Sequence, residues 1–150
     1  MTDSREASPL SIDEQLCFAL YTTSRAFTKL YSNLLGALGL TYPQYLTMLI
    51  LWERDGQSVK AIAEKLELEG ATITPMIQRL ERLDLVLKKR RTDDERRQDV
   101  LLTEKGRALR DEILGIPGQI GCAVNLNTEQ ARKLLNKINT LREAIRDHAS

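Results

Sequence analysis

Residues 58–103 read SVKAIAEKLELEGATITPMIQRLERLDLVLKKRRTDDERRQDVLLT, and this stretch decides the predicted fold. Its first two segments, VKAIAEKL and ATITPMIQRLERLDLV, repeat apolar residues at helical spacing and are separated by a break at Glu69-Gly70. Ser58 is placed to cap the first helix. The period then changes, because VLKKR and DVLLT are short β-prone runs that flank RTDDERRQ, a loop without apolar residues. The stretch therefore predicts two helices followed by an antiparallel hairpin.

Two further helices are predicted before this stretch. Residues 13–38 repeat leucines and a phenylalanine at helical spacing without an intervening proline, and Gly39 closes the run. Pro43 stands where the first turn of a helix tolerates a missing N–H group, so a second helix begins near Tyr42. Its sequence YLTMLILW is apolar nearly all round, which predicts that this helix is buried.

Helical segments also follow the hairpin. Thr103 can cap a helix that ends near residues 115–118. The segment GIPGQIGCAV, residues 115–124, contains a proline and two internal glycines that are expected to interrupt the helix and to permit a large local movement. A last amphipathic helix begins near Asn127-Thr128. The predicted fold class is mainly α, with about six helices plus a β-hairpin wing.

The order of these elements describes a winged helix-turn-helix, which predicts DNA binding. The whole chain has a formal net charge of +1, yet residues 71–97 carry eight Lys and Arg against five Asp and Glu. A helix of this kind fits the major groove of B-DNA, and the basic hairpin can reach phosphates or the minor groove. The candidate DNA-binding residues are Thr72, Thr74, Gln78 and Arg79 on the helix and Lys88, Arg90, Asp94 and Arg96 on the hairpin. Asp94 is close enough in sequence to orient the Arg96 guanidinium.

A DNA-binding module of this size contacts only a few base pairs, so tight binding to a specific DNA site needs two copies of the module. The amphipathic stretches at both ends exceed what a winged helix needs, and such helices commonly bury themselves in a symmetric partner. We therefore expect one domain over residues 1–150, with 13–38 and 104–147 forming a homodimer interface and 43–103 forming the DNA-binding region. The alternative is that the terminal helices only cap the core of a monomer.

Length and composition exclude several classes of protein. The 150 residues are 42% hydrophobic and suffice for one compact domain. No run of roughly 18 apolar residues and no secretory signal is seen, so we expect a cytoplasmic protein without membrane association. Cys17 and Cys122 are too far apart in sequence for a metal knuckle. No Gly-rich phosphate loop, Ser-His-Asp set or paired-carboxylate site stands out, so we expect neither an enzyme nor a bound cofactor or metal.

Several motifs resemble a known family. The segments SVKAIAEKL, GATITPMIQRLERLDLV and DDERRQDVLLTEKG, in this order, resemble the MarR family of dimeric bacterial repressors. Within that family, LCFALY, LTYPQYLTMLILWE and ITPMIQRLE are similar to the organic hydroperoxide resistance repressors. The resemblance extends over residues 16–141, nearly the whole chain.

The resemblance implies roles for five residues. Cys17 matches the cysteine that senses peroxide, and Tyr31 and Tyr42 match tyrosines whose hydroxyls hold that sulfur across the dimer interface. Tyr21 matches a further aromatic residue beside it, and Cys122 matches the second cysteine of the two-cysteine subgroup. The reduced homodimer would bind an inverted-repeat operator in double-stranded DNA. Organic hydroperoxide would convert Cys17 to a sulfenic acid and then to an intersubunit disulfide with Cys122, which releases the DNA.

The spacing of Cys17 and Tyr31 adds a geometric argument. Fourteen positions separate them, which is about 21 Å along a continuous helix. They can meet only if Tyr31 belongs to the partner chain or if the helix is broken.

Other readings of the same residues remain open. The trigger can instead be a small phenolic or other anionic ligand held between the helical and DNA-binding regions. The cysteines can serve a thiol peroxidase, although the chain lacks the alternating strand and helix pattern of thioredoxin-like enzymes, or they can be inert packing residues. A nucleoid protein without sequence preference is a further alternative.

Overall fold

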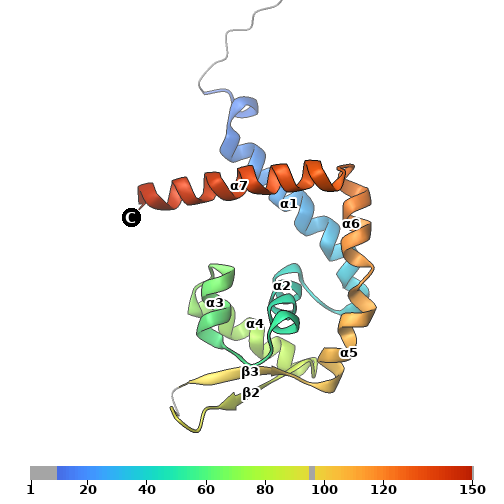
Figure 1. Cartoon of the computed structure of the whole chain (residues 1–150), viewed down its shortest axis with the longest axis vertical. Coiled ribbons are helices and arrows are strands. Elements are labelled where there is room, and N and C mark those ends of the chain that lie inside the picture. The colour runs from blue at the N-terminus through green and yellow to red at the C-terminus, as the bar shows by residue number, and fades with distance from the viewer. Residues whose placement is uncertain (1–9, 95–96, 150) are drawn as a thin grey trace, which may run out of the picture. The chain divides into compact units, whose positions relative to one another are not determined.

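A computed structural model describes residues 10–94 and 97–149. The chain divides into two compact units, one ending at Asp111 and the other beginning at Glu112. The described residues contain seven α-helices, two 3-10 turns and three short strands, which confirms a mainly α fold with a β-hairpin. Figure 1 shows the elements in chain order.

The first helical segment is shorter than the sequence predicted. A 3-10 turn, η1 (Ile12–Glu14), is followed by α1 (Leu16–Leu35) and a second 3-10 turn, η2 (Gly36–Leu38). The prediction of one helix over 13–38 is therefore corrected, because Gln15 has an extended backbone that separates η1 from α1. Gly39 ends the segment in the left-handed region at φ 68°, as its glycine predicted.

The second helix, α2 (Tyr42–Glu53), forms the centre of the first unit. Pro43 lies in its first turn, and the Gln44 side chain accepts a hydrogen bond from the Thr41 backbone N–H at 2.9 Å. Several of its side chains are buried, as predicted for an apolar helix: Gln44, Tyr45, Thr47, Met48, Ile50 and Leu51. At its end, Trp52 donates a 2.8 Å hydrogen bond from Nε1 to the Gly106 carbonyl.

The two helices of the helix-turn-helix are α3 (Val59–Leu66) and α4 (Gly70–Arg82). The Ser58 hydroxyl accepts a 3.0 Å hydrogen bond from the Ala61 N–H, which confirms the predicted cap of α3. Glu67 turns the chain in the left-handed region at φ 56°. The buried faces of the two helices consist of Ile62 on α3 and Ile73, Met76, Ile77 and Leu80 on α4.

The predicted hairpin is confirmed and gains a third strand. Strands β2 (Val86–Arg90) and β3 (Gln98–Leu102) pair antiparallel, and β1 (Gln57–Ser58) pairs with the other edge of β3. Their order in the sheet is β1-β3-β2. In Figure 1, α2, α3 and α4 lie on one side of the hairpin. A two-residue strand has no period of its own, so the sequence pattern could not indicate β1.

The residues after β3 tie the hairpin to the helix that follows, α5 (Glu104–Ile113). Thr103 Oγ1 accepts a 2.9 Å hydrogen bond from the Gly106 N–H, which confirms the predicted cap. Gly106 packs against backbone, because a Cβ at this position would overlap the Leu85 carbonyl. This contact requires glycine.

The second unit contains the end of α5, then α6 (Ile116–Val124) and α7 (Thr128–Ala149). The expectation that the glycines and proline interrupt helix over residues 115–124 is wrong. Pro117 falls in the first turn of α6, where its missing N–H leaves no intrahelical bond unmade. Reciprocal bonds between Asn127 and Gln130 cap α7 at 2.8 and 3.0 Å.

No single helix among the described residues has the length and hydropathy needed to cross a membrane. The segments Leu16–Leu38 and Tyr42–Glu53 reach the threshold only together, as a pair bent by 73°.

Candidate nucleic-acid interface and cysteine sites

The polar face of α4 is open to solvent. Ile73, Met76, Ile77 and Leu80 face the core, and the four residues that the sequence assigned to DNA lie outside this buried stripe. All four are exposed: Thr72, Thr74, Gln78 and Arg79. The exposed surface of the helix therefore carries hydroxyl, amide and guanidinium groups, which are the donors and acceptors that read base edges.

The wing strand β2 is attached to α4 through Glu81. The Lys88 backbone N–H donates a 3.2 Å hydrogen bond to Glu81 Oε1, and Lys88 Nζ lies 3.2 Å from Glu81 Oε2. The side chains of both residues are only about a quarter to a third exposed, at 25% for Lys88 and 30% for Glu81. Arg90 lies at the exposed end of the same strand. Lys88 therefore holds the wing in place and contributes charge to its surface.

The tip of the wing is partly described. Asp94 is half-buried, whereas Arg96 lies outside the described residues, as does any pairing between the two. Asp94 Oδ2 lies 3.6 Å from Nε of Arg97, and the Arg97 N–H donates a 2.9 Å hydrogen bond to the Asp94 carbonyl. Arg91 donates two hydrogen bonds to Asp93, at 3.0 and 3.1 Å, which lower the pKa of that carboxyl group.

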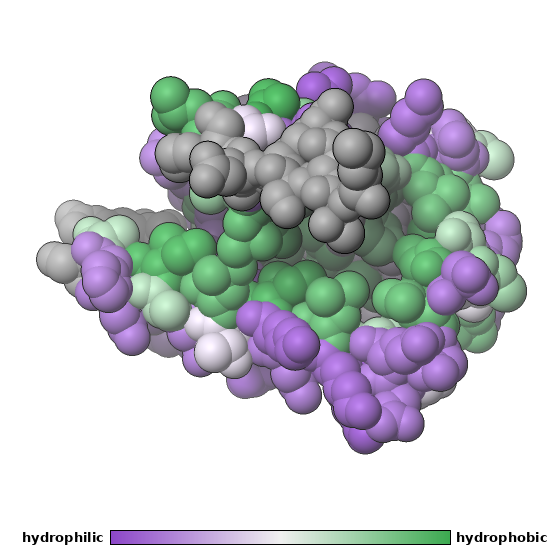
Figure 2. Space-filling view, turned by 90° about the horizontal axis from the view of Figure 1, so that it is seen from above, coloured by the Kyte–Doolittle hydropathy of each residue, from purple (hydrophilic) through white to green (hydrophobic). Residues whose placement is uncertain are grey.

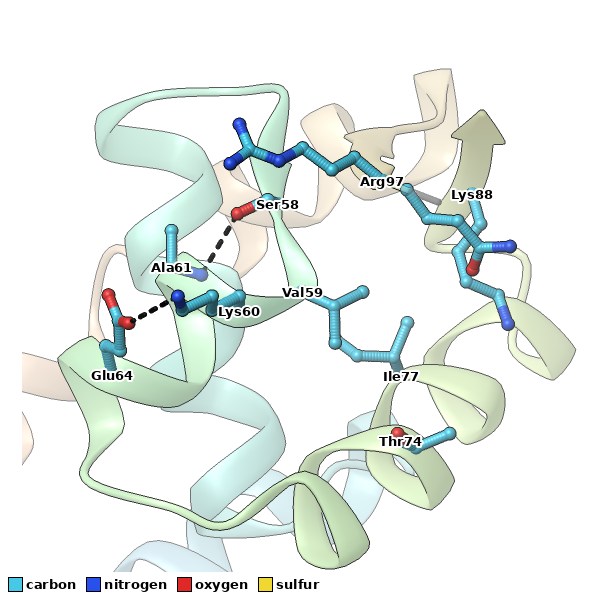
Figure 3. Close-up of a pocket in the computed structure, with 10 residues that line it drawn as sticks. Ser58, Val59, Lys60, Ala61, Glu64, Thr74, Ile77, Lys88 and Arg97 are labelled. Atoms are coloured by element: carbon cyan, nitrogen blue, oxygen red, sulfur yellow. Dashed lines mark hydrogen bonds and ion pairs between the residues drawn. The ribbon is translucent and has the colours of Figure 1, made fainter. Parts of the chain in front are cut away.

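A cavity of about 520 Å³ lies between α3, α4 and the wing. Four charged side chains line it. Three are basic and come from different elements, Lys60 from α3, Lys88 from β2 and Arg97 from the residue before β3, and one is acidic, Glu64 from α3. Figure 3 shows these residues around the opening, with Val59 and Ile77 between them. Neither Lys60 nor Arg97 was among the DNA-binding residues predicted from the sequence. Arg97 lies in residues 71–97, where basic residues outnumber acidic ones, but nothing in the helical pattern distinguishes Lys60 from other exposed lysines.

Both cysteines are free thiols and both are exposed. Cys17 lies in the first turn of α1 and Cys122 lies in α6, so the two belong to different units. Tyr31 lies on the same unbroken helix as Cys17. The possibility of a broken helix is therefore excluded, and within one chain the two residues are about 21 Å apart along the axis.

Three tyrosines form a cluster where α1 meets α2. The Tyr31 ring centroid lies 4.5 Å from that of Tyr42 and 5.4 Å from that of Tyr45, and Tyr42 and Tyr45 are 6.3 Å apart. Burial raises the pKa of Tyr31 to about 12, and the neighbouring Tyr45 and Tyr42 add to the rise. Burial also raises the pKa of Tyr42 and of Tyr45. All three side chains are therefore neutral hydroxyl groups near neutral pH and can donate hydrogen bonds.

Tyr45 was not among the residues predicted from the sequence, and its side chain is only 3% exposed. A signal for it was present, because the spacing of YPQY places Tyr45 about one helical turn after Tyr42.

The structure does not bring Tyr21 into this cluster. Its side chain is 59% exposed, and its hydroxyl accepts a 3.4 Å hydrogen bond from Arg25 Nη1. The Arg25 guanidinium also lies over the Tyr21 ring, 5.6 Å from its centroid. Tyr21 is one turn after Cys17 on α1, so it accompanies the cysteine and not the other tyrosines.

No group of three or more His, Cys, Asp or Glu side chains in the described residues is arranged to hold a metal ion.

The chain is similar to several transcriptional regulators. The sequence family described as transcriptional regulator SarA/Rot matches residues 29–113. The organic hydroperoxide resistance transcriptional regulator of Bacillus subtilis (strain 168) is 40% identical over 136 residues, which cover 91% of this chain and 92% of that protein. The HTH-type transcriptional regulator TtmR of Methylorubrum extorquens (strain PA1) is 38% identical over 149 residues, covering 99% of this chain and 76% of that protein. The structure of reduced AbfR bound to DNA superposes with a TM-score of 0.79 at 29% identity, covering 93% of this chain and 95% of that one.

Proposed function

Because this chain belongs to the MarR/SarA family of transcriptional regulators, we propose that it is a repressor that senses organic hydroperoxides. The observation that carries the proposal is an exposed Cys17 thiol on α1 in a chain that also carries a winged helix with a polar recognition face. The similarity to a B. subtilis organic hydroperoxide resistance regulator supports the class of inducer. The similarity to a reduced regulator bound to DNA supports DNA binding by the reduced protein. The overoxidised form of that regulator is also bound to DNA, so we assign release to the disulfide and not to oxidation of the sulfur alone.

The DNA target is an inverted-repeat operator. One copy of α4 enters the major groove of each half-site, and the two copies sit about 34 Å apart along the duplex. The wing follows the neighbouring backbone and minor groove with its basic residues. In this arrangement the winged helix spans residues 43–103.

The proposed homodimer is supported by apolar side chains that stay exposed in the described part of the chain. Those on the two terminal helices include Leu16, Phe18 and Phe27 on α1 and Leu134, Leu135, Ile138 and Ile145 on α7, each at least 36% exposed. Figure 2 shows hydrophobic residues at the surface among hydrophilic ones. Residues 13–38 and 104–147 would bury these faces against the partner chain. In the homodimer the tyrosine cluster of the partner chain could contact Cys17. Tyr31 of the same chain is too far from Cys17 along α1 to do so.

The proposed chemistry begins at Cys17. Its thiolate attacks the terminal oxygen of the peroxide and the O–O bond breaks. The sulfur gains the OH group and becomes a sulfenic acid, and the alkoxide takes a proton from solvent and leaves as the alcohol. Hydroxyl groups of Tyr31 and Tyr42 from the partner chain would donate hydrogen bonds to the thiolate. The Cys122 thiol of the partner then attacks the sulfenic sulfur, which forms an intersubunit disulfide and releases water.

The disulfide would release DNA by moving helices. The sequence suggested that Cys122 lies in a segment without continuous helix. It lies instead in α6, so a bond to Cys17 would pull on a helix. A change in the separation of the two recognition helices that costs about 3 kcal/mol weakens operator binding by more than a hundredfold.

Operator binding before and after treatment with an organic hydroperoxide tests the proposal. We expect Cys17→Ser to bind the operator with or without peroxide, and Cys122→Ser to bind but to form no intersubunit disulfide on a nonreducing gel. Peroxide-dependent release by Cys17→Ser would refute the cysteine switch. A dimer band of normal intensity from Cys122→Ser would refute the pairing.

A second candidate trigger is a small ligand. A cavity of about 450 Å³ opens within the first unit, lined by Ser24, Thr28, Thr41, Tyr42, Pro43, Gln44, Leu46, Leu66, Leu68, Thr72 and Met76. Its lining has hydroxyl groups but no charged side chain, which favours a neutral phenol over an anion. Titration of operator-bound Cys17→Ser with phenols separates the two triggers, because a redox switch predicts no release.

A further inference from the structure

The surface between α4 and the wing must accommodate a strand of DNA if the two elements enter neighbouring grooves. If α4 lies in a major groove and the hairpin reaches the adjacent minor groove, one sugar-phosphate strand separates the two. That strand must cross the space between the helix and the hairpin. In this protein the space is the 520 Å³ cavity between α3, α4 and the wing.

We propose that this cavity seats the DNA strand that divides the two grooves, with Lys60, Lys88 and Arg97 neutralising its phosphates. The proposal rests on the DNA binding proposed above and assigns a phosphate-contacting role to Lys60 and Arg97. The hydroxyls of Ser58 and Thr74 and the amide of Gln98 also line the cavity and can donate hydrogen bonds to phosphate oxygens. In Figure 3, Arg97 extends from the wing toward the start of α3, so its charge reaches the opening.

The lengths and exposure of the ion pairs of these residues indicate which basic side chains can exchange a carboxylate partner for a phosphate. Lys60 Nζ lies 3.7 Å from Glu64 and Arg97 Nε lies 3.6 Å from Asp94, and the Lys60 and Arg97 side chains are 85% and 67% exposed. Long, exposed pairs of this kind contribute little, so phosphate can replace the carboxylate at small cost. Lys88 differs, because its shorter pair with Glu81 is more protected.

Salt dependence provides the first test. Removing one cation that neutralises a phosphate makes the slope of log affinity against log salt shallower by about 0.9. We therefore expect the affinity advantage of wild type over Lys60→Ala to shrink about threefold to fourfold as salt rises from about 50 to 200 mM, for operator and random DNA alike. Arg97→Ala should behave in the same way, and Lys60→Arg should retain the wild-type slope. Thermal unfolding confirms that each variant is folded.

Lys65→Ala is the matched control. Lys65 lies on the same helix, but it pairs with Glu53 at 2.8 Å and does not line the cavity. It should change the slope less than Lys60→Ala. Equal slopes for Lys60→Ala and Lys65→Ala would overturn the proposal.

A neutral methylphosphonate in the operator provides the second test. It is moved along the strand that divides the grooves, one phosphate at a time. At one position the methylphosphonate should weaken operator binding by wild type and leave operator binding by Lys60→Ala unchanged. The neutral phosphonate and the Lys60→Ala substitution would each remove the same interaction. Fully additive effects at every position would overturn the assignment. If wild type binds operator and random DNA equally well, the proposed repressor function is wrong. The phosphate contacts are tested separately, by the slopes of log affinity against log salt.

Discussion

The rings of Tyr31 and Tyr42 lie 4.5 Å apart although they come from different helices, α1 and α2. Both hydroxyls are protonated near neutral pH, as for any tyrosine, and their raised pKa values extend the protonated form to more alkaline pH. Two half-buried tyrosines, each with a hydroxyl that can donate a hydrogen bond, therefore lie side by side where α1 meets α2. In the proposed homodimer this pair serves the Cys17 thiolate of the partner chain.

Tyr31→Phe and Tyr42→Phe should each slow the oxidation of Cys17. A hydrogen bond to a charged group contributes about 1.5–3 kcal/mol, so its removal should lower the second-order rate with an organic hydroperoxide by about tenfold or more. Rapid-mixing measurement of thiol consumption gives this rate. Operator binding by the reduced protein should stay unchanged. Wild-type rates in both variants would contradict the proposed role of these tyrosines.

Tyr45 should act through its ring and not through its hydroxyl. It is 3% exposed and packs 5.4 Å from Tyr31 and 6.3 Å from Tyr42, which fixes the positions of both rings. Tyr45→Phe keeps this packing and should oxidise at the wild-type rate, whereas Tyr45→Leu should oxidise more slowly. If Tyr45→Leu reacts as fast as wild type while Tyr31→Phe is slow, Tyr45 does not position the cluster.

Alkaline pH should reveal the burial of Tyr31. Its folded-state pKa is raised from 10.0 to about 12, so above about pH 10 the folded chain keeps a proton that the unfolded chain releases. Its contribution to the free energy of unfolding is full below about pH 10 and is lost as the pH rises toward 12. Urea denaturation between about pH 9 and 12 measures this decline. Tyr31→Phe should decline less steeply, and identical slopes would show that Tyr31 does not contribute.

Asp55 should be important for stability despite its position in a turn. Its Oδ1 accepts hydrogen bonds from the N–H groups of Gly56 at 2.9 Å and Leu102 at 2.8 Å, and its Oδ2 lies 3.1 Å from Arg107. Asp55→Ala leaves these donors without the carboxylate and should cost about 1–3 kcal/mol in urea unfolding. Glu53→Ala, which removes only an exposed pair with Lys65, is the control and should have a smaller effect. Equal effects would argue against the Asp55 network.

Local sequence patterns were sufficient for the winged helix. The periods of VKAIAEKL and of the hairpin strands, together with the caps at Ser58 and Thr103, depend on neighbouring residues and are confirmed. The same local reasoning was wrong for residues 115–124. It treated Pro117 as an interruption, whereas a proline in the first turn of a helix leaves no intrahelical hydrogen bond unmade.

Other features depended on contacts between residues far apart in the sequence. The tyrosine cluster joins α1 to α2, strand β1 exists only because β3 pairs with it, and the cavity collects Lys60, Lys88 and Arg97 from separate elements. A sequence by itself determines which side chains share a face of one helix or strand, because that follows from the backbone repeat. Which faces meet is decided by packing of the whole unit, and only the tertiary structure shows it.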